Sequence, residues 1–201
     1  TVVSNNVIKN YEYCIYINSG AGIGCTISGN SLLAAARAIQ LSGTGGTPTF
    51  LASTISGNSL YSATYGIRSD VELSIVNISD NSIASANGIY LNYASVNVGI
   101  VDNVFNTSTS AIFGDGFTNS SITGNSISGN TGSGISISNS ANYCSVSDNT
   151  IYVDSYPIEV TASSSNLSIS GNSLTSVSNH ALSVSGSASH LTLNGNTSES
   201  I

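Results

Sequence analysis

A six-residue motif recurs through the whole length of this 201-residue chain. Its fullest form is ISGNSL, at 27–32, 55–60 and 169–174, and its edited forms are VSNNVI (3–8), ISDNSI (78–83), IVDNVF (100–105), ITGNSI (122–127), VSDNTI (146–151) and LNGNTS (193–198). One asparagine is common to all copies, at intervals of 22 to 28 residues: Asn6, Asn30, Asn58, Asn81, Asn103, Asn125, Asn149, Asn172 and Asn196. A repeat of this length is typical of chains built from small units that pack only on their neighbours.

The pattern inside each repeat predicts short strands rather than helices. In ISGNSL apolar and polar residues alternate, and a bend at the Gly-Asn pair resets the phase, so that Ile27 and Leu32 both face inward. A second short strand follows each asparagine by 8 to 10 residues: CIYI (14–17), AIQL (38–41), GIRS (66–69), GIYL (88–91), AIFG (111–114), GISI (134–137), PIEV (157–160) and ALSV (181–184). Each period therefore holds at least two strands and two or three turns.

Stacking of successive repeats would bring like residues over like residues. The position three before each asparagine is apolar throughout: Val3, Ile27, Ile55, Ile78, Ile100, Ile122, Val146, Ile169 and Leu193. The position two after it is apolar in all copies but the last: Ile8, Leu32, Leu60, Ile83, Phe105, Ile127, Ile151, Leu174 and Ser198. These two columns predict one continuous core, with parallel strands about 4.8 Å apart.

The repeated asparagines are predicted to form a structural ladder. A side-chain amide both donates and accepts hydrogen bonds, so stacked asparagines can bond along the column and to the turn backbone. A catalytic asparagine in every repeat would have no chemical purpose.

With these motifs the chain resembles the right-handed parallel β-helix repeat proteins of the pectin-lyase-like superfamily, over essentially all its residues. The resemblance implies an all-β fold: a right-handed, single-stranded parallel β-helix of about eight coils, with roughly 22–24 residues per coil. Residues 1–201 would form one domain. The superfamily includes pectate and pectin lyases, polygalacturonases, virus tailspikes and non-enzymatic surface proteins, so the resemblance specifies architecture and not activity.

Composition excludes several classes of partner. Charged residues make up 6% of the chain, and its net charge is −7 with only three basic residues, too few to neutralise a nucleic-acid backbone. No apolar run approaches the roughly 20 residues that a membrane helix needs. We expect no nucleic acid, no membrane insertion, no cofactor and no metal. The expected partners are other copies of the chain, adjoining β-helix coils and polysaccharide.

The three cysteines are predicted to be small buried side chains. Cys25 and Cys144 share the position five before the asparagine but lie several coils apart, so they cannot pair with each other. Cys14 occupies a position that Ala or Gly fills in other repeats.

Two outward strips are candidate binding faces. The Ser/Thr strip consists of the residues four and two before the asparagines from Asn30 on: Thr26 and Ser28, Thr54 and Ser56, Asn77 and Ser79, Ser121 and Thr123, Ser145 and Ser147, Ser168 and Ser170, and Thr192 and Asn194, interrupted only by Gly99 and Val101. The outward position of the second strand instead holds Tyr16, Gln40, Arg68, Tyr90, Phe113, Ser136, Glu159 and Ser183. Exposed aromatics beside polar groups suit sugar stacking or a protein partner, so Tyr16, Arg68, Tyr90 and Phe113 are the predicted binding residues.

Catalytic signals are weak. Asp80 and Asp102 share a column in adjacent coils, where two carboxylates roughly 5 Å apart could be a retaining pair or a cation site, but the position is a turn that alternates with glycine. The clustered Asp, His-Gly and Arg-x-Lys signatures of polygalacturonases do not occur, since Ala follows His180 and Leu follows His190. Arg68 and Glu72 are expected to form an ordinary surface ion pair.

Two segments depart from the plain repeat. Residues 31–41 have helical propensity, but the register favours strand, with a single helical turn at 33–37 as the alternative. Residues 42–49 are expected to form a Gly/Thr loop that projects from one coil.

These patterns favour a non-catalytic extracellular or surface-exposed β-helix with a structural or binding role, such as a stalk, sheath, fibre, filament or adhesin segment. The alternatives are a polysaccharide-degrading enzyme of the tailspike depolymerase or lyase type, and an ice-binding solenoid that uses the Ser/Thr strip. Neither end carries a capping element, so we expect the unit to lie within a longer β-helix or a filament.

Overall fold

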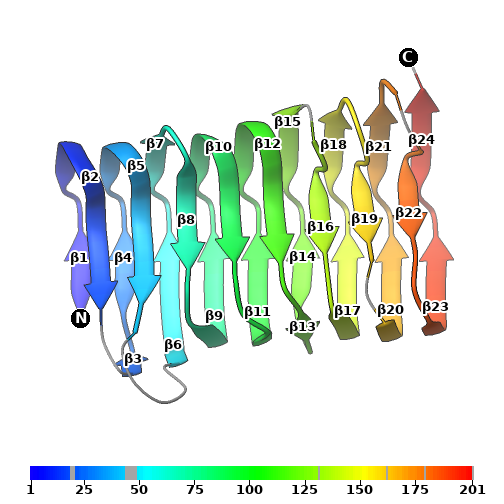
Figure 1. The fold of residues 1–201 in the computed structure, drawn as a ribbon, viewed down its shortest axis with the longest axis horizontal. Coiled ribbons are helices and arrows are strands. Elements are labelled where there is room, and N and C mark those ends of the chain that lie inside the picture. Colours follow the sequence, from blue (N-terminus) through cyan, green and yellow to red (C-terminus); the bar gives the residue numbers. More distant parts are fainter. Residues whose placement is uncertain (19–20, 44–48, 131, 162, 179, 201) are drawn as a thin grey trace.

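The computed structural model describes residues 1–18, 21–43, 49–130, 132–161, 163–178 and 180–200. They form a parallel β-solenoid whose coils stack along one axis, with the first and last coils at opposite ends (Figure 1). Within these residues every strand is built from β-paired backbone and none of the elements is a helix. The described residues therefore contain no helix long and apolar enough to cross a bilayer.

Two sheets run the length of the stack. The 11-stranded sheet holds β1 (Val2–Ser4), β3 (Ala21–Ile23), β4 (Thr26–Ser28), β6 (Thr49–Ser56), β9 (Glu72–Ser79), β11 (Ser95–Val101), β13 (Phe117–Thr118), β14 (Ser121–Thr123), β17 (Ser140–Ser147), β20 (Ser163–Ser170) and β23 (Ala188–Asn194). The 13-stranded sheet holds β2 (Val7–Asn18), β5 (Ser31–Ser42), β7 (Ser59–Ser62), β8 (Tyr65–Ser69), β10 (Ser82–Leu91), β12 (Val104–Gly114), β15 (Ser126–Asn130), β16 (Ile135–Ile137), β18 (Thr150–Val153), β19 (Ile158–Val160), β21 (Ser173–Ser176), β22 (Leu182–Val184) and β24 (Thr197–Ser200).

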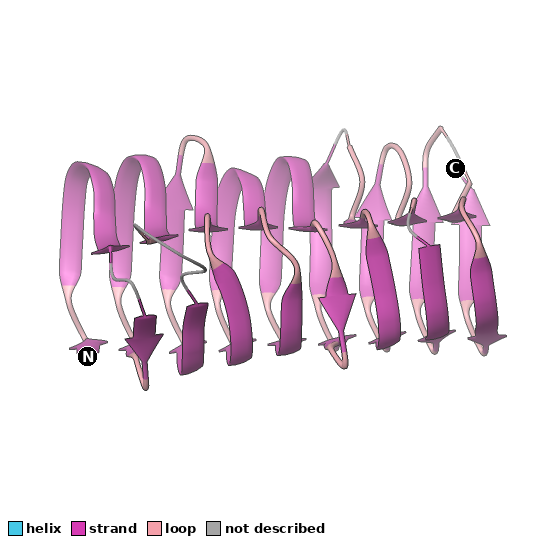
Figure 2. Cartoon of the chain, turned by 60° about the horizontal axis from the view of Figure 1, so that its bottom comes forward, coloured by secondary structure: helices cyan, strands magenta, loops and turns pink. Residues whose placement is uncertain are grey.

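The long strands of the second sheet bend instead of ending. β2, β5, β10 and β12 curve over one edge of the solenoid, whereas β7 and β8, and the strands of the coils after β12, are shorter and joined by loops along the same path (Figures 1 and 2). The pairing register shifts between Ser85 and Asn87 on β10, and also along β2. Such irregularities let one strand turn a corner without losing its neighbours.

The predicted asparagine ladder is confirmed from Asn6 to Asn196. The backbone N–H and Nδ2 of Asn103 donate to Oδ1 of Asn125 at 3.0 and 3.1 Å, and its own Oδ1 accepts the same pair of bonds from Asn81 at 3.0 and 2.9 Å. Its Nδ2 also lies 2.9 Å from the carbonyl of Ile78. Asn103 is fully buried, so water cannot reach the backbone groups that the turn leaves unpaired, and the asparagine side chains form hydrogen bonds with them instead.

The two predicted core columns are also confirmed. Their members from the second to the eighth copy of the motif are at most 2% exposed. The columns weaken in the first and last coils, where Val3 and Ile8 are partly buried and Leu193 is 52% exposed. In-register parallel pairing, such as Ile78 beside Ile100, is what places like residues together.

Two glycines make room for the largest core side chains. A Cβ on Gly114 would collide with the ring of Phe117, and a Cβ on Gly88 would collide with the ring of Phe105. Both rings are at most 1% exposed. Glycine at these positions therefore lets a phenylalanine fit into coils whose neighbours carry smaller residues.

Two turn columns adopt the left-handed backbone conformation. The residue before every ladder asparagine has a positive φ: Asn5, Gly29, Gly57, Asp80, Asp102, Gly124, Asp148, Gly171 and Gly195. The residue six before the asparagine does the same from the second coil on: Gly24, Ala52, Ile75, Asn97, Asn119, Tyr143, Asn166 and His190. The first column uses the residue types that tolerate this conformation, but the second includes residues that do not.

The unusual segments follow the repeat. Residues 31–42 are the continuous strand β5, so the repeat register overrides their helical propensity. Of the predicted Gly/Thr loop, residues 44–48 lie outside the described residues, and Thr49 already belongs to β6.

We predict that Asn103→Ala lowers the free energy of unfolding by about 1–3 kcal/mol, because it leaves the buried N–H of Asn81 and the carbonyl of Ile78 without partners. Chemical denaturation measures the change. Asn106→Ala removes an exposed asparagine from the next strand and should cost less than about 0.5 kcal/mol. Equal stability of Asn103→Ala and wild type would refute the structural role of the ladder.

We predict that Ile75→Asn stabilises the protein by about 1 kcal/mol and raises Tm by roughly 2–4 °C. Ile75 is β-branched with φ of 56° and 57% exposed, so the substitution relieves backbone strain at little cost in burial. Ile75→Val keeps the β-branch and should leave Tm unchanged. A Tm for Ile75→Asn at or below that of Ile75→Val would show that the strain is not released.

Candidate functional site

The outward column of the second strand is in register across eight coils. Tyr16 pairs with Gln40, Gln40 with Arg68, Arg68 with Tyr90, and Tyr90 with Phe113. Ser136, Glu159 and Ser183 continue the column. The structure thus brings the four predicted binding residues into one line, about one strand spacing of 4.8 Å per coil.

A second column beside it places Arg37 between two tyrosines that share the turn before the second strand in their coils. Tyr13 pairs with Arg37, and Arg37 with Tyr65. The guanidinium carbon of Arg37 lies 5.2 Å from the ring centre of Tyr13 and 5.7 Å from that of Tyr65. Arg37 is therefore held between two tyrosine rings by cation–π contacts.

The two columns merge into one continuous surface. The guanidinium carbon of Arg68 lies 4.9 Å from the ring centre of Tyr65 and 5.7 Å from that of Tyr90. Tyr90 stacks on Phe113 at 4.5 Å between ring centres and 16° between ring planes. We call the set Tyr13, Tyr16, Arg37, Tyr65, Arg68, Tyr90 and Phe113 the Tyr/Arg strip.

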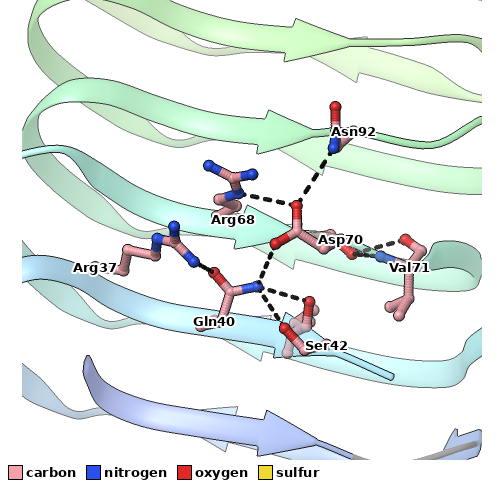
Figure 3. Close-up of polar contacts among 9 residues, drawn as sticks. Arg37, Gln40, Ser42, Arg68, Asp70, Val71 and Asn92 are labelled. Carbon is pink, nitrogen blue, oxygen red and sulfur yellow. Dashed lines mark hydrogen bonds and ion pairs between the residues drawn. The ribbon is translucent and has the colours of Figure 1, made fainter. Parts of the chain in front are cut away.

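Gln40 corrects one expectation, because it is fully buried although its column faces outward. Its Oε1 accepts a 2.7 Å hydrogen bond from Nη1 of Arg37, and its Nε2 lies 3.1 Å from Oδ2 of Asp70 and 2.8 Å from Oγ of Ser42 (Figure 3). Gln40 therefore acts as a buried bridge beneath the strip rather than as a surface residue.

The ion pair of Arg68 is also different from the one expected. Nε of Arg68 donates to Oδ1 of Asp70 at 2.9 Å, and not to Glu72 (Figure 3). Burial opposes the charge of Arg68, but the hydrogen bond and the proximity of Asp70 outweigh it and raise the pKa of the guanidinium. Asp70 also accepts from Asn92 at 3.4 Å and from Gln40, so both of its oxygens are engaged.

The rings of the strip differ in accessibility. Tyr16 is 53% exposed, whereas Tyr65, Tyr90 and Phe113 are half-buried. Stacking covers one face each of Tyr90 and Phe113, and Tyr65 meets Tyr90 edge to face at 5.2 Å. A sugar ring stacks on an exposed aromatic face, so Tyr16 is the best placed of the predicted aromatic residues.

The two aspartates considered for catalysis occupy the left-handed turn column. Asp80 and Asp102 have φ of 58° and 54° and are exposed. Oδ1 of Asp102 occupies the space that a Cβ on Gly124 would need in the next coil. Their occurrence is explained by backbone conformation, since aspartate tolerates this region better than most residues.

A shallow depression of about 340 Å³ lies elsewhere, over the bend of β7, β10 and β12. Tyr61, Ala84, Asn106 and Gly129 are among its lining residues. Tyr61 is the one ionisable side chain among the described residues that line it, so the depression brings no carboxylates together.

The cysteines are free thiols. Cys25 and Cys144 are buried, as predicted from their column, whereas Cys14 is only half-buried because it lies in the first coil. Burial raises the pKa of Cys14 and of Cys144, so neither thiol is activated as a nucleophile. The described residues contain no group of three or more His, Cys, Asp or Glu side chains arranged to hold a metal ion.

The Ser/Thr strip is a half-buried face of the first sheet. Its side chains partly satisfy one another: the hydroxyls of Thr123 and Ser147 lie 3.2 Å apart, and Nδ2 of Asn77 donates to Oγ of Ser79 at 3.2 Å. Gly99 and Val101 pair into the same column and interrupt it. Its side chains are thus partly engaged within the sheet.

We predict that Gln40→Leu lowers the free energy of unfolding by about 1 kcal/mol, because Arg37 and Asp70 lose a hydrogen-bond partner inside the protein. Ser136→Ala, in the same column, should change it by less than about 0.5 kcal/mol. Urea unfolding compares them, and equal midpoints would contradict the bridging role of Gln40.

Comparison with known proteins agrees with the architecture. The family model described as "Right handed beta helix region" matches residues 37–198, which include the solenoid coils from Arg37 of the Tyr/Arg strip onward. A search of curated proteins found no match to this sequence. The family match covers most of the chain and coincides with its parallel coils, so the chain belongs to the right-handed β-helix family.

Proposed function

We propose that this chain is a non-catalytic structural or binding β-helix that acts outside the cell, as part of a stalk, fibre or adhesin, and that its Tyr/Arg strip contacts carbohydrate. Non-enzymatic members of the superfamily that it resembles act at cell or virion surfaces, which supports this location.

The Tyr/Arg strip is the observation that carries the proposal. It combines an exposed ring, Tyr16, with fixed donors and acceptors on Arg68, Asp70 and Asn92. Aromatic rings give sugars an apolar surface, and neighbouring polar groups select among hydroxyls. Because the rings and guanidiniums of the strip extend over successive coils, the strip suits an extended glycan chain better than a small sugar.

The non-catalytic part of the proposal is supported by the carboxylates. Glycosidic cleavage by two acids needs them to flank one bond. Asp80 and Asp102 are exposed turn residues, and Asp70 is engaged by Arg68, Gln40 and Asn92. Asp70, which lies next to the strip, thus serves to hold Arg68.

The ladder supports the proposed partners, which are adjoining coils or other copies of the chain. At each step the donors belong to the earlier coil and the accepting Oδ1 to the later one, as in the step from Asn172 to Asn196. The stack therefore has a direction. A further coil, from the same chain or another, would continue it by presenting an asparagine Oδ1 to Asn196.

The test is retention of the protein in gels that contain neutral or acidic glycans. We expect retention by at least one glycan class, and Tyr16→Ala should weaken it about fivefold through loss of the exposed ring. Tyr61→Ala is the matched control, because Tyr61 is 63% exposed on a different face. The same incubations should release no reducing ends and no unsaturated products.

Two results would reject the proposal. Equal weakening by Tyr16→Ala and Tyr61→Ala, or no retention at all, would remove the strip as a carbohydrate surface. Glycan turnover that disappears in Asp102→Asn would show instead that the protein is an enzyme.

A further inference from the structure

Two of the three basic residues of the chain lie next to each other on the Tyr/Arg strip. Arg37 and Arg68 both contact the ring of Tyr65, at 5.7 and 4.9 Å. Lys9, the third, is exposed on the third position of β2, in the column of Leu33 and Tyr61. In a chain of net charge −7 this gathering calls for a local reason.

The protein uses only part of each guanidinium. Arg37 donates from Nη1 to Gln40, and Arg68 donates from Nε to Asp70. Within the described residues these are the hydrogen bonds and ion pairs that the two side chains make, although a guanidinium carries five N–H donors. The remaining donors of Arg68 include both terminal nitrogens, and its side chain is 21% exposed.

The donors are also held in place. The rings of Tyr13 and Tyr65 lie on either side of Arg37, and Tyr65 and Tyr90 contact Arg68. Gln40 and Asp70 fix one edge of the respective guanidiniums, and Gln40 is itself fully buried. Orienting a side chain before binding reduces the entropy that a ligand must overcome.

Nearby acids limit the attraction but do not occupy the free donors. Asp70 is engaged by Arg68, Gln40 and Asn92, and Glu12 acts mainly on the phenol of Tyr13, whose pKa it raises. Recognition would therefore rest on directed, charge-assisted hydrogen bonds rather than on a broad positive field. Oxyanions, which accept two parallel N–H bonds, are the groups that such guanidiniums prefer.

We propose that Arg37 and Arg68 form an oxyanion-binding site that takes the carboxylate or sulfate groups of an acidic glycan. The inference rests on the proposed function and narrows its ligand class. The site lies in the earlier coils of the column. In a later coil, beyond Phe113 and Ser136, the same position is Glu159, whose carboxylate would repel an anionic ligand.

The experiment measures retention of the protein at low salt in gels that contain one of three polymers. Alginate presents carboxylates, dextran sulfate presents sulfates, and neutral dextran is the uncharged control. Wild type should bind at least one acidic polymer about tenfold more tightly than dextran. The Arg37→Gln/Arg68→Gln double variant should lose that preference and bind dextran as wild type does. Tighter binding of alginate identifies carboxylate as the source, and tighter binding of dextran sulfate identifies sulfate.

Two variants separate the site from general charge. Lys9→Gln removes the same unit of charge as each arginine change and should alter binding less than twofold or so. Arg68→Lys keeps the charge but loses the planar fork, and should weaken acidic-polymer binding several-fold, roughly as Arg68→Gln does. It also serves as the test if the double variant fails to fold, which circular dichroism and Tm would reveal.

The outcomes separate this inference from the proposed function. If glycans bind through Tyr16 but the double variant keeps the wild-type preference, the oxyanion site is wrong and the proposed function stands. If Lys9→Gln weakens binding as much as the arginine variants, the effect is general charge and the inference fails. Self-association that the double variant abolishes, without glycan binding, would make the strip a contact between copies and overturn both.

Discussion

Every coil of this protein is held to the next by the same interaction, the bond from one asparagine amide to the next in the buried ladder. The turn before each asparagine is left-handed, so its backbone groups cannot all pair within the two sheets. The asparagine side chain satisfies them by reaching both neighbouring coils, as Asn103 does with Asn81 and Asn125. Because an unpaired buried polar group is costly, this requirement fixes both the spacing and the register of the stack.

In-register parallel stacking has a second consequence, which is that each side chain meets its counterpart one strand spacing away. For apolar residues this produces the core columns. For charged residues it brings like charges within about 5 Å, and the 6% charged content of the chain agrees with that penalty. The Tyr/Arg strip avoids the penalty by alternation, since Arg37 pairs with Tyr13 and Tyr65, and Arg68 pairs with Gln40 and Tyr90, so neither arginine stacks on a charged residue.

The same alternation gives the strip its chemistry. The tyrosine rings orient the guanidiniums. The buried Gln40 anchors one edge of the Arg37 guanidinium, and Asp70 anchors one edge of the Arg68 guanidinium. What remains outward is a set of oriented N–H donors next to an exposed tyrosine. A surface of this kind is suited to binding along an extended ligand. Asp80 and Asp102, by contrast, occupy turn positions with a left-handed backbone, which aspartate tolerates better than most residues.

The sequence alone determined the solenoid, the ladder and two core columns, because these depend on residues at fixed spacing along the chain, and stacking repeats them identically. It also put Tyr16, Arg68, Tyr90 and Phe113 in one column. Only the tertiary structure decided the features that depend on side-chain contacts between coils: the burial of Gln40, the choice of Asp70 over Glu72 by Arg68, and the position of Arg37 between Tyr13 and Tyr65. The upstream segments of the first sheet, such as the one that begins at Thr49, and the left-handed backbone of Ile75 also escaped the pattern. The upstream segments are short and change composition from coil to coil, as Phe50 beside Leu73 and Leu51 beside Ser74 show, and Ile75 is an unfavourable turn former. Their conformation is therefore imposed by neighbouring coils more than by their own preferences.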